Sequence, residues 1–160
     1  MEQFKTTEDL REYIKTIKNF RARPSPRGVH PTLYITDQDK ENPKIHMGVR
    51  ELDYLFSPDF NWVLDSNEMG LSFSAHWQHL KDMYNYKKRR NKGANIDVYW
   101  TFEEADLPSG LAFVPDPTDR KKWHYFLVVT KKMRVSELAG KLQWMADHMA
   151  KITDATKVLT

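Results

Sequence analysis

Hydrophobic residues recur every three or four positions in three separate stretches of the chain, and this spacing is typical of amphipathic helices. The stretches cover residues 7–18, 76–88 and 136–152. Their apolar stripes consist of Leu10, Tyr13, Ile14 and Ile17, then Trp77, Leu80, Met83 and Tyr84, and last Leu138, Leu142, Met145 and Met149. Ser74 is a candidate N-cap for the second helix. We therefore predict three helices, with the apolar stripe of each packed on a sheet.

Shorter alternating or continuously apolar runs lie between these helices and predict strands. The predicted strands cover residues 32–36, 60–65, 69–74, 97–102, 111–114 and 123–130. Prolines and a glycine in "NFRARPSPRGVHP" exclude a helix and suggest a short strand that leads into a loop. Residues 49–56 suggest a further short helix.

The order helix, strands, helix, strands, helix indicates an α+β fold. We expect a mostly antiparallel or mixed central sheet with flanking helices, within one domain that spans residues 1–160. Long helices do not alternate regularly with strands, which disfavours a doubly wound fold.

Composition excludes several classes of protein. The 160 residues include no cysteine, so a disulfide scaffold, a thiolate metal site and a cysteine nucleophile are excluded. Glycine-rich phosphate motifs are missing, and the six histidines lack zinc-ligand spacing, so we expect no metal. No apolar run has the length of a membrane span or signal peptide, and we expect a cytoplasmic protein without a membrane partner.

A basic run at the end of the second predicted helix offers two interpretations. It contains Lys87, Lys88, Arg89, Arg90 and Lys92, in a chain of net charge +3. Cations suit the negative end of a helix dipole, so the run can be a solvated helix terminus. It can also bind phosphate backbones, with Tyr84 and Tyr86 available to stack on bases.

Three further groups are candidates for chemistry. Ser72 and Ser74 alternate with apolar residues on one strand, so their hydroxyls share a face. Arg21 and Arg23 share a face of the early strand, and guanidinium groups suit diphosphates. Glu103 follows an aromatic strand, where a carboxylate can stabilise an oxocarbenium ion. Each group also fits a structural role, as an edge strand or as a solvated turn.

The segments "FRARP", "GLSFS", "VYWTFEEADLPSGLAFVPD", "HYFLVV" and "KKMRVSELAGKLQWM", in this order, resemble the ADP-ribosyltransferase-like bacterial toxins. The similar branch is the type VI secretion effector family related to mono-ADP-ribosyltransferases. The resemblance covers about residues 19–149. The Glu-x-Glu pattern of the superfamily is replaced by "FEEAD".

The resemblance implies a split antiparallel sheet with NAD in its central cleft, as the donor substrate of a transferase. Arg21 or Arg23 would hold the dinucleotide, with Ser72 also in the cofactor site. Ser72, Ser74, His124 and Glu103 are the implied catalytic residues. Arg21 or Arg23, Ser72, Ser74 and His124 are expected to line one cleft. The target would be a protein or nucleic acid, and an antitoxin or immunity protein is a plausible partner.

The alternative function is a nucleic-acid-binding module without catalysis, which would use the basic run at residues 87–92. The two functions can coincide, because a transferase that modifies RNA or DNA also needs a basic surface.

Overall fold

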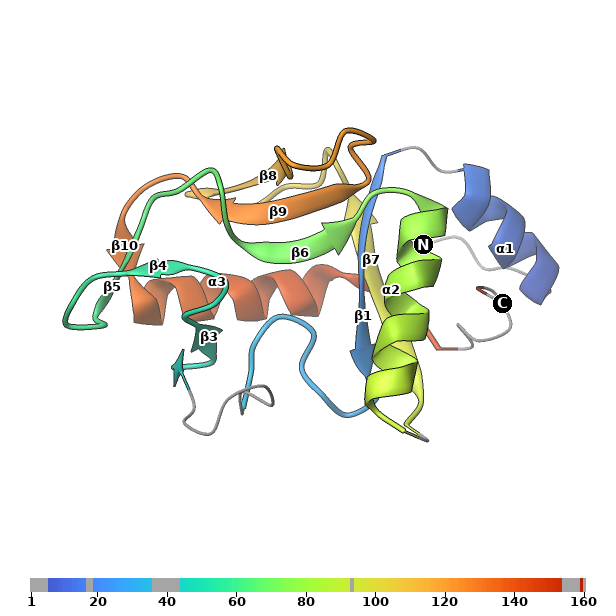
Figure 1. The fold of residues 1–160 in the computed structure, drawn as a ribbon, viewed down its shortest axis with the longest axis horizontal. Coiled ribbons are helices and arrows are strands. Elements are labelled where there is room, and N and C mark those ends of the chain that lie inside the picture. Colours follow the sequence, from blue (N-terminus) through green and yellow to red (C-terminus); the bar gives the residue numbers. More distant parts are fainter. Residues whose placement is uncertain (1–5, 17–18, 36–43, 93, 154–158, 160) are drawn as a thin grey trace.

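The computed structural model describes residues 6–16, 19–35, 44–92, 94–153 and 159. This part of the chain is a mixed α+β fold in which every strand pair is antiparallel (Figure 1). The helices are α1 (Thr7–Thr16), α2 (Trp77–Arg90) and α3 (Val135–His148). The strands are β1 (Phe20–Pro26), β2 (Ile45–His46), β3 (Val49–Arg50), β4 (Leu55–Phe56), β5 (Trp62–Leu64), β6 (Leu71–Ser74), β7 (Ile96–Phe102), β8 (Leu111–Pro115), β9 (His124–Val129), β10 (Met133–Arg134) and β11 (Ala150–Ile152).

The main sheet has six strands in the order β11-β7-β1-β6-β9-β8. Strand β1 pairs with β7 along its whole length, but it pairs with β6 only where Ala22 faces Ser74. Beyond that point the strands β6, β9 and β8 run across β1 and β7 (Figure 1). The sheet therefore consists of two halves that are joined near one end of β1.

Two prolines in β1 explain why the halves separate. The N–H of Arg27 donates to the carbonyl of Asn95, next to β7. Backbone N–H groups alternate sides along a strand, so positions 24 and 26 face away from β7. Pro24 and Pro26 have no N–H there, and β6 cannot form a ladder with them.

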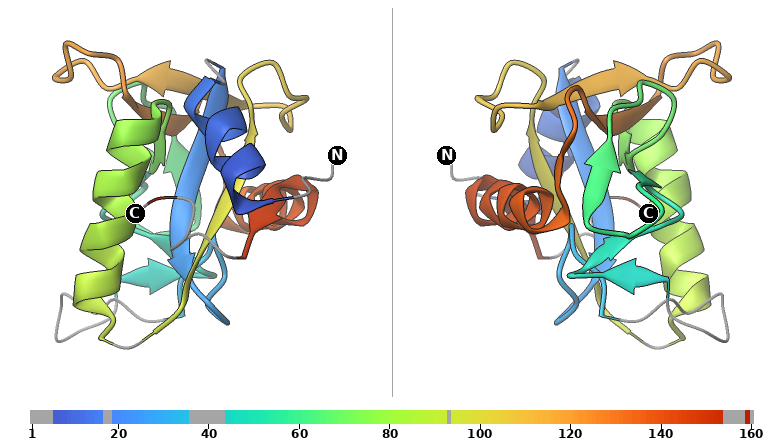
Figure 2. Two further views of the ribbon diagram at one scale, coloured as in Figure 1. Left: turned by 90° about the vertical axis from the view of Figure 1, so that its right-hand side faces the viewer. Right: turned by 90° about the vertical axis from the view of Figure 1, so that its left-hand side faces the viewer.

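Each face of the sheet carries its own core. On one face α1 and α2 cover β1 and β7, with Ile14, Leu80, Tyr84 and Trp100 among the buried residues. On the other face α3 packs under β6 and β9 (Figures 1 and 2). Leu71, Phe73, Leu127, Leu138 and Leu142 belong to that second core. The predicted packing of apolar helix stripes on a sheet is thus confirmed for most of the described stripe residues, but Met83 of α2 is exposed.

The strands predicted at 69–74, 97–102, 111–114 and 123–130 are confirmed as β6 to β9, with ends that differ by one or two residues. The strand predicted at 60–65 is confirmed in its centre, as β5. The early strand is confirmed as β1. The first helix is confirmed to Thr16, and residues 17–18 lie outside the described part.

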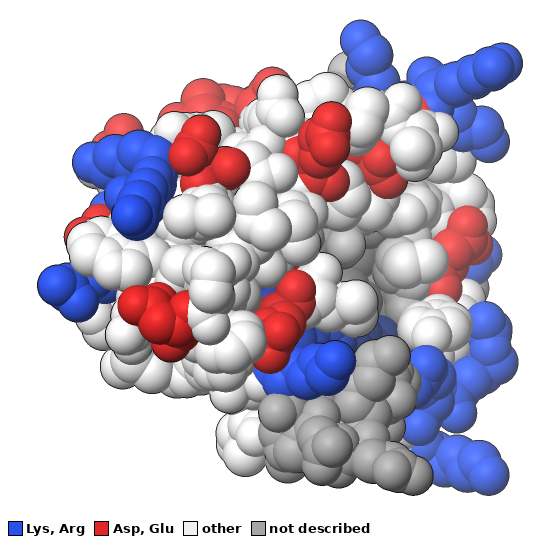
Figure 3. All heavy atoms as spheres, turned by 60° about the vertical axis from the view of Figure 1, so that its left-hand side comes forward, with Lys and Arg blue, Asp and Glu red and all other residues white. Residues whose placement is uncertain are grey.

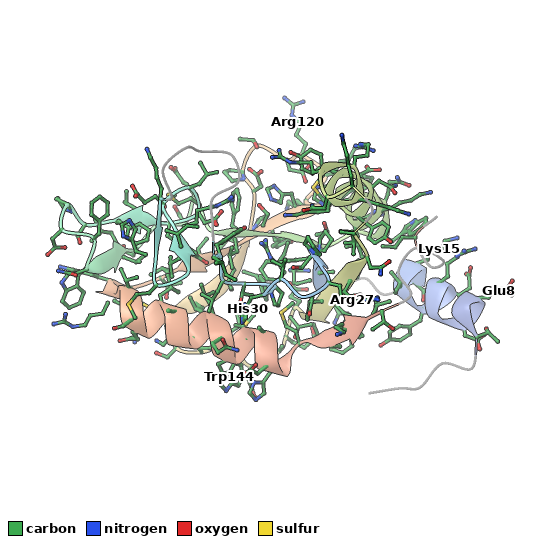
Figure 4. The ribbon with its side chains drawn as sticks, turned by 90° about the horizontal axis from the view of Figure 1, so that it is seen from below. Glu8, Lys15, Arg27, His30, Arg120 and Trp144 are labelled. Atoms are coloured by element: carbon green, nitrogen blue, oxygen red, sulfur yellow. The ribbon has the colours of Figure 1, made fainter. Side chains whose placement is uncertain are left out.

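The strand predicted at 32–36 is wrong over residues 32–35, which form a loop; residue 36 lies outside the described part. Side chains fix this loop on α3, because Thr32 Oγ1 donates to the carbonyl of Leu142 at 2.8 Å. His30, labelled in Figure 4, lies 3.1 Å from Gln143 of α3. These contacts replace the backbone ladder that a strand would need.

The helix predicted at 49–56 is also wrong, since β3 and β4 occupy its two ends. Gly48 adopts a φ of 85°, which turns the chain into β3. The hydroxyl of Tyr54 donates to the carbonyl of Leu127 in β9, at 2.8 Å. Long-range contacts therefore override the helical spacing of this short segment.

The closing helix ends at His148, four residues before its predicted end, and residues 150–152 form β11 on the edge of the sheet.

Within the described residues, no helix has both the length and the apolar character that crossing a membrane requires.

Candidate functional site

A cluster of polar side chains lies where β6 meets β1 and β9. Ser72 and Ser74 share one face of β6, as the alternation predicted, while Leu71 and Phe73 face the core. In the sheet register Ser74 faces Ala22 of β1 and His124 of β9. Ser74 and His124 therefore lie on the same face, which confirms that part of the expected arrangement.

Ser74 is hydrogen-bonded to a histidine that the sequence analysis did not select. Its Oγ lies 2.7 Å from Nδ1 of His79, in the first turn of α2. Ser74 is 2% exposed, so its hydroxyl is enclosed.

The N-cap of α2 is His76, whose Nδ1 accepts from the N–H of Gln78 at 3.0 Å. The prediction of Ser74 as the cap is therefore wrong.

His124 is paired with a carboxylate on its other side. Its Nδ1 lies 2.8 Å from Oδ2 of Asp116, which directly follows β8. Burial opposes the ionisation of Asp116, but hydrogen bonds from Thr118 and His124 outweigh it and lower its pKa. A carboxylate that accepts from Nδ1–H fixes the tautomer and leaves Nε2 of His124 as the basic nitrogen.

The two imidazoles face each other. The ring centroids of His79 and His124 are 5.5 Å apart. Burial, and next the charge of His124, lower the pKa of His79, which is therefore neutral at pH 7. The Nε2 atoms of both histidines bond no described residue. They are not fully buried either, because Nε of Arg21 is the only buried side-chain nitrogen or oxygen without a partner in the described part of the chain. Both Nε2 atoms are therefore accessible from the surface. We call Ser74, His79, His124 and Asp116 the acid–base cluster.

The loop between β8 and β9 supports this cluster. Asp119 accepts hydrogen bonds from the backbone N–H groups of Trp123 and His124, at 3.0 and 2.9 Å. The Trp123 ring stacks on His76 at 3.9 Å between centroids. These contacts fix the start of β9 against the start of α2, and so they hold the two imidazoles at their separation.

The predicted arginines lie on the opposite face of the sheet. Because Ala22 shares a face with Ser74, its neighbours Arg21 and Arg23 point the other way. The expectation that arginines and serines line one cleft is therefore wrong. The physical reason is the register of the strands. It places the odd positions of β1 on the same face of the sheet as the core residues Leu71 and Phe73 of β6.

Arg21 is enclosed as well as turned away. It is 2% exposed, and its guanidinium carbon lies 3.8 Å from the Tyr125 ring centroid. Among the described residues, its one ion pair joins it to Glu103, at 3.3 Å, and the side chain of Glu103 is 57% exposed. Burial lowers the pKa of Arg21, while Glu103 acts against this. Arg21 and Glu103 thus form a pair at the end of β1, apart from the acid–base cluster.

The basic run divides into two parts. Lys88, Arg89, Arg90 and Lys92 are exposed, whereas Lys87 is partly buried. Arg90 donates to the hydroxyl of Tyr86 at 2.8 Å. The exposed part is the one that fits a nucleic-acid surface.

Two cavities lie along α3, and none of the predicted site residues lines either of them. Their volumes are about 320 and 450 Å³. Trp144 lines both and projects from α3, stacked on His148 at 3.8 Å (Figure 4).

The sequence analysis missed His79 and Asp116. His79 follows Ser74 by five residues, across a strand-to-helix turn. Neither the spacing of a helix nor that of a strand predicts that two side chains so placed are in contact. The segment "DPTD" before His124 is a turn signal that could have indicated Asp116. In the described ranges no group of three or more His, Cys, Asp or Glu residues could hold a metal ion.

Comparisons with protein-family models, with curated proteins and with solved structures find no match to this chain.

Proposed function

We propose that this protein is an ADP-ribosyltransferase that uses NAD as its donor and the acid–base cluster as its catalytic centre. The observation that carries the proposal is the Asp116–His124 pair opposite a neutral His79 that Ser74 holds. Paired imidazoles with open Nε2 atoms suit proton transfer near neutral pH.

The architecture supports the same reaction class. The resemblance to ADP-ribosyltransferase-like toxins implies a split antiparallel sheet. Strand β1 pairs with β6 at a single position, and the acid–base cluster lies at that position. We therefore propose that the fold is ADP-ribosyltransferase-like.

The proposed reaction breaks the bond between C1′ of the ribose and the nicotinamide nitrogen. The bonding electrons leave with nicotinamide, and an oxocarbenium-like state forms at C1′. An acceptor O–H or N–H, from a macromolecular target or from water when no target is present, forms the new bond to C1′ as nicotinamide departs, within the same oxocarbenium-like transition state. Its proton passes to Nε2 of His124, which Asp116 orients.

Ser74 has a positioning role in this scheme. Its hydroxyl is buried and bonded to His79, so it acts on the substrates through that histidine. Ser72 is exposed, and its side chain has no partner among the described residues, so this proposal gives Ser72 no catalytic or cofactor-binding role, in contrast to what the resemblance implies. Glu103 and Arg21 lie apart from this centre, and the proposal does not depend on them.

The test is nicotinamide release from NAD by wild type, by His124→Ala and by His148→Ala. We expect wild type and His148→Ala to release nicotinamide at equal rates, because His148 lies on α3 outside the cluster. His124→Ala should lose about a hundredfold or more, the usual contribution of a positioned base. Equal rates for all three proteins, or no release by any, would overturn the proposal.

A second candidate is nucleic-acid binding by Lys88, Arg89, Arg90 and Lys92. The observation in its favour is their joint exposure at the end of α2, beside the exposed ring of Tyr86. This surface is compatible with catalysis, because a transferase acting on nucleic acid would use it to hold its target.

A further inference from the structure

Trp144 projects from α3 and lines both of the cavities beside this helix (Figure 4). The cavity of about 320 Å³ also includes His148 at the end of α3, and the cavity of about 450 Å³ includes Gly140 and the first turn of the helix. Asp106 and Leu107, from the loop between β7 and β8, line both cavities as well, so the two adjoin. We call the combined space the Trp144 groove.

The Trp144 groove is long and separate from the acid–base cluster. Its lining residues on α3 extend from Ser136 to His148, which is about 18 Å along a helix axis. About five residues of an extended chain span that length. The groove lies beside α3, whereas His79 of the cluster belongs to α2, on the other face of the sheet. Its shape therefore fits an extended peptide that does not enter the candidate catalytic centre.

One face of the Trp144 indole is covered and the other is open. The imidazole of His148, four residues later, stacks on it at 3.8 Å between centroids, and Nδ1 of His148 donates to the carbonyl of Trp144 at 2.8 Å. Side chains on a helix lean toward the residues three and four positions earlier, so the other face of the indole looks toward Gly140. A Cβ added at Gly140 would meet nothing within 4 Å. The space beside the open face is therefore free.

Helix stability does not explain the glycine at position 140. Glycine in a helix interior costs about 1 kcal/mol relative to alanine. Close packing is no reason either, because the space around an added Cβ is empty. A side chain at this position would project into the larger cavity, which Gly140 lines. The glycine therefore keeps the Trp144 groove open beside the indole.

Asp106 supplies the groove with a negative charge that no cation of the described residues pairs with. Lys141, which also lines the groove, is already balanced, because its Nζ donates to Glu137 at 2.8 Å and to the carbonyl of Ser109. Lys131 donates to the hydroxyl of the same serine. The C-terminal end of α3 adds the negative pole of its helix dipole. The charge left for a ligand beside Trp144 is thus negative.

We propose that the Trp144 groove binds an extended peptide of a partner protein through an arginine side chain. The planar guanidinium stacks on the open face of Trp144 and donates to the carboxylate of Asp106. Tryptophan and arginine are also the residues that most often dominate the energy of protein interfaces.

The distribution of charge over the molecule agrees with a basic partner at this place. Lysine and arginine side chains gather along the right-hand edge of Figure 3, where Figure 2 (right) places α2. Helix α3 lies on the opposite side of the molecule in that view. A basic peptide is repelled from the edge formed by α2, so α3 is the more favourable side for it.

Two labelled peptides of five residues test the charge requirement. One is an alanine peptide with a central arginine, acetylated and amidated at its ends, and the other has citrulline in place of arginine. Citrulline keeps the shape of the arginine side chain without its charge. Fluorescence anisotropy should show that the arginine peptide binds at least about tenfold more tightly, since it makes a charge-assisted hydrogen bond that citrulline lacks. No binding of the arginine peptide, or equal affinity for both peptides, would overturn the proposal.

Three variants place the binding in the groove. Asp106→Asn removes the charge, and Gly140→Met fills the space beside the indole. Asp147→Asn is the matched control, because Asp147 is an exposed carboxylate of α3 that lines neither cavity. The first two variants should bind the arginine peptide at least about tenfold more weakly, and the control should bind it as wild type does. Equal affinity in all of these proteins would contradict a site in the Trp144 groove.

Loss of folding cannot imitate this result in Gly140→Met, since methionine is a better helix former than glycine and the variant should be at least as stable as wild type. A further measurement uses wild-type protein alone. The arginine peptide should shift the indole N–H resonance of Trp144 in a heteronuclear NMR spectrum and leave that of Trp62, on β5, unchanged. A shift of Trp62 without one of Trp144 would assign the peptide to another surface. None of these experiments uses NAD, so their failure leaves the transferase proposal standing.

Discussion

Lys87 makes the clearest single-residue prediction about stability. Its pKa in the folded chain, about 8, lies below the ordinary value of 10.5. Between these values the unfolded chain binds more protons than the folded one, so stability should rise with pH. Urea unfolding at pH 7.5 and 9.5 should show this increase in wild type and lose it in Lys87→Met. Equal increases in both proteins would assign the effect to another group.

Asp116 makes the corresponding prediction about activity. Asp116→Asn keeps the oxygen that accepts from the N–H and hydroxyl of Thr118, so the turn should persist. It removes the carboxylate that orients His124, and kcat for nicotinamide release should fall about a hundredfold while KM changes little. A selective rise in KM would instead place Asp116 in substrate binding.

At the scale of elements, the strands of the main sheet could be predicted because their apolar patterns are local. Residues 32–35 and 49–56 could not, since the bonds of Thr32 to α3 and of Tyr54 to β9 decide their conformation. The same limit applies to the site. Alternation placed Ser72 and Ser74 on one face, but only strand pairing brings Ser74 to His124 and turns the arginines away.

The contact between β6 and β9 makes a prediction at this scale. A Cβ added at Gly70 would lie 2.1 Å from the carbonyl oxygen of Leu127, which is a backbone atom and cannot rotate aside. Gly70→Ala should therefore destabilise the protein by about 2 kcal/mol or more. Gly140→Ala is the control, because a Cβ there meets nothing within 4 Å, and it should stabilise α3 by up to about 1 kcal/mol. Urea unfolding measures the free energy of unfolding of both variants. Equal effects would show that the backbone of Leu127 can shift to admit a side chain at position 70.

At the scale of the whole molecule, the exposed cations Lys88, Arg89, Arg90 and Lys92 at the end of α2 are the candidate nucleic-acid surface. Replacing Lys88, Arg89, Arg90 and Lys92 by Ala should leave the melting temperature nearly unchanged, because exposed charges contribute little. If the surface binds RNA, its affinity should drop and the slope of log affinity against log salt should flatten. Unchanged RNA binding would identify the run as a solvated helix end.

The central claim is that the acid–base cluster performs ADP-ribosyl transfer, and two serines on one face of β6 test it most directly. Ser74 bonds His79, and Ser72 is exposed two residues away. The measurement is the transfer of label from NAD, labelled in its adenylate phosphate, to macromolecules of a cell lysate, with protease and nuclease digestion to identify the target class. Wild type and Ser72→Ala should transfer label equally, and Ser74→Ala should transfer at least about tenfold less while losing only about 1 kcal/mol of stability. No transfer by wild type, or equal transfer by a folded Ser74→Ala, would contradict the account.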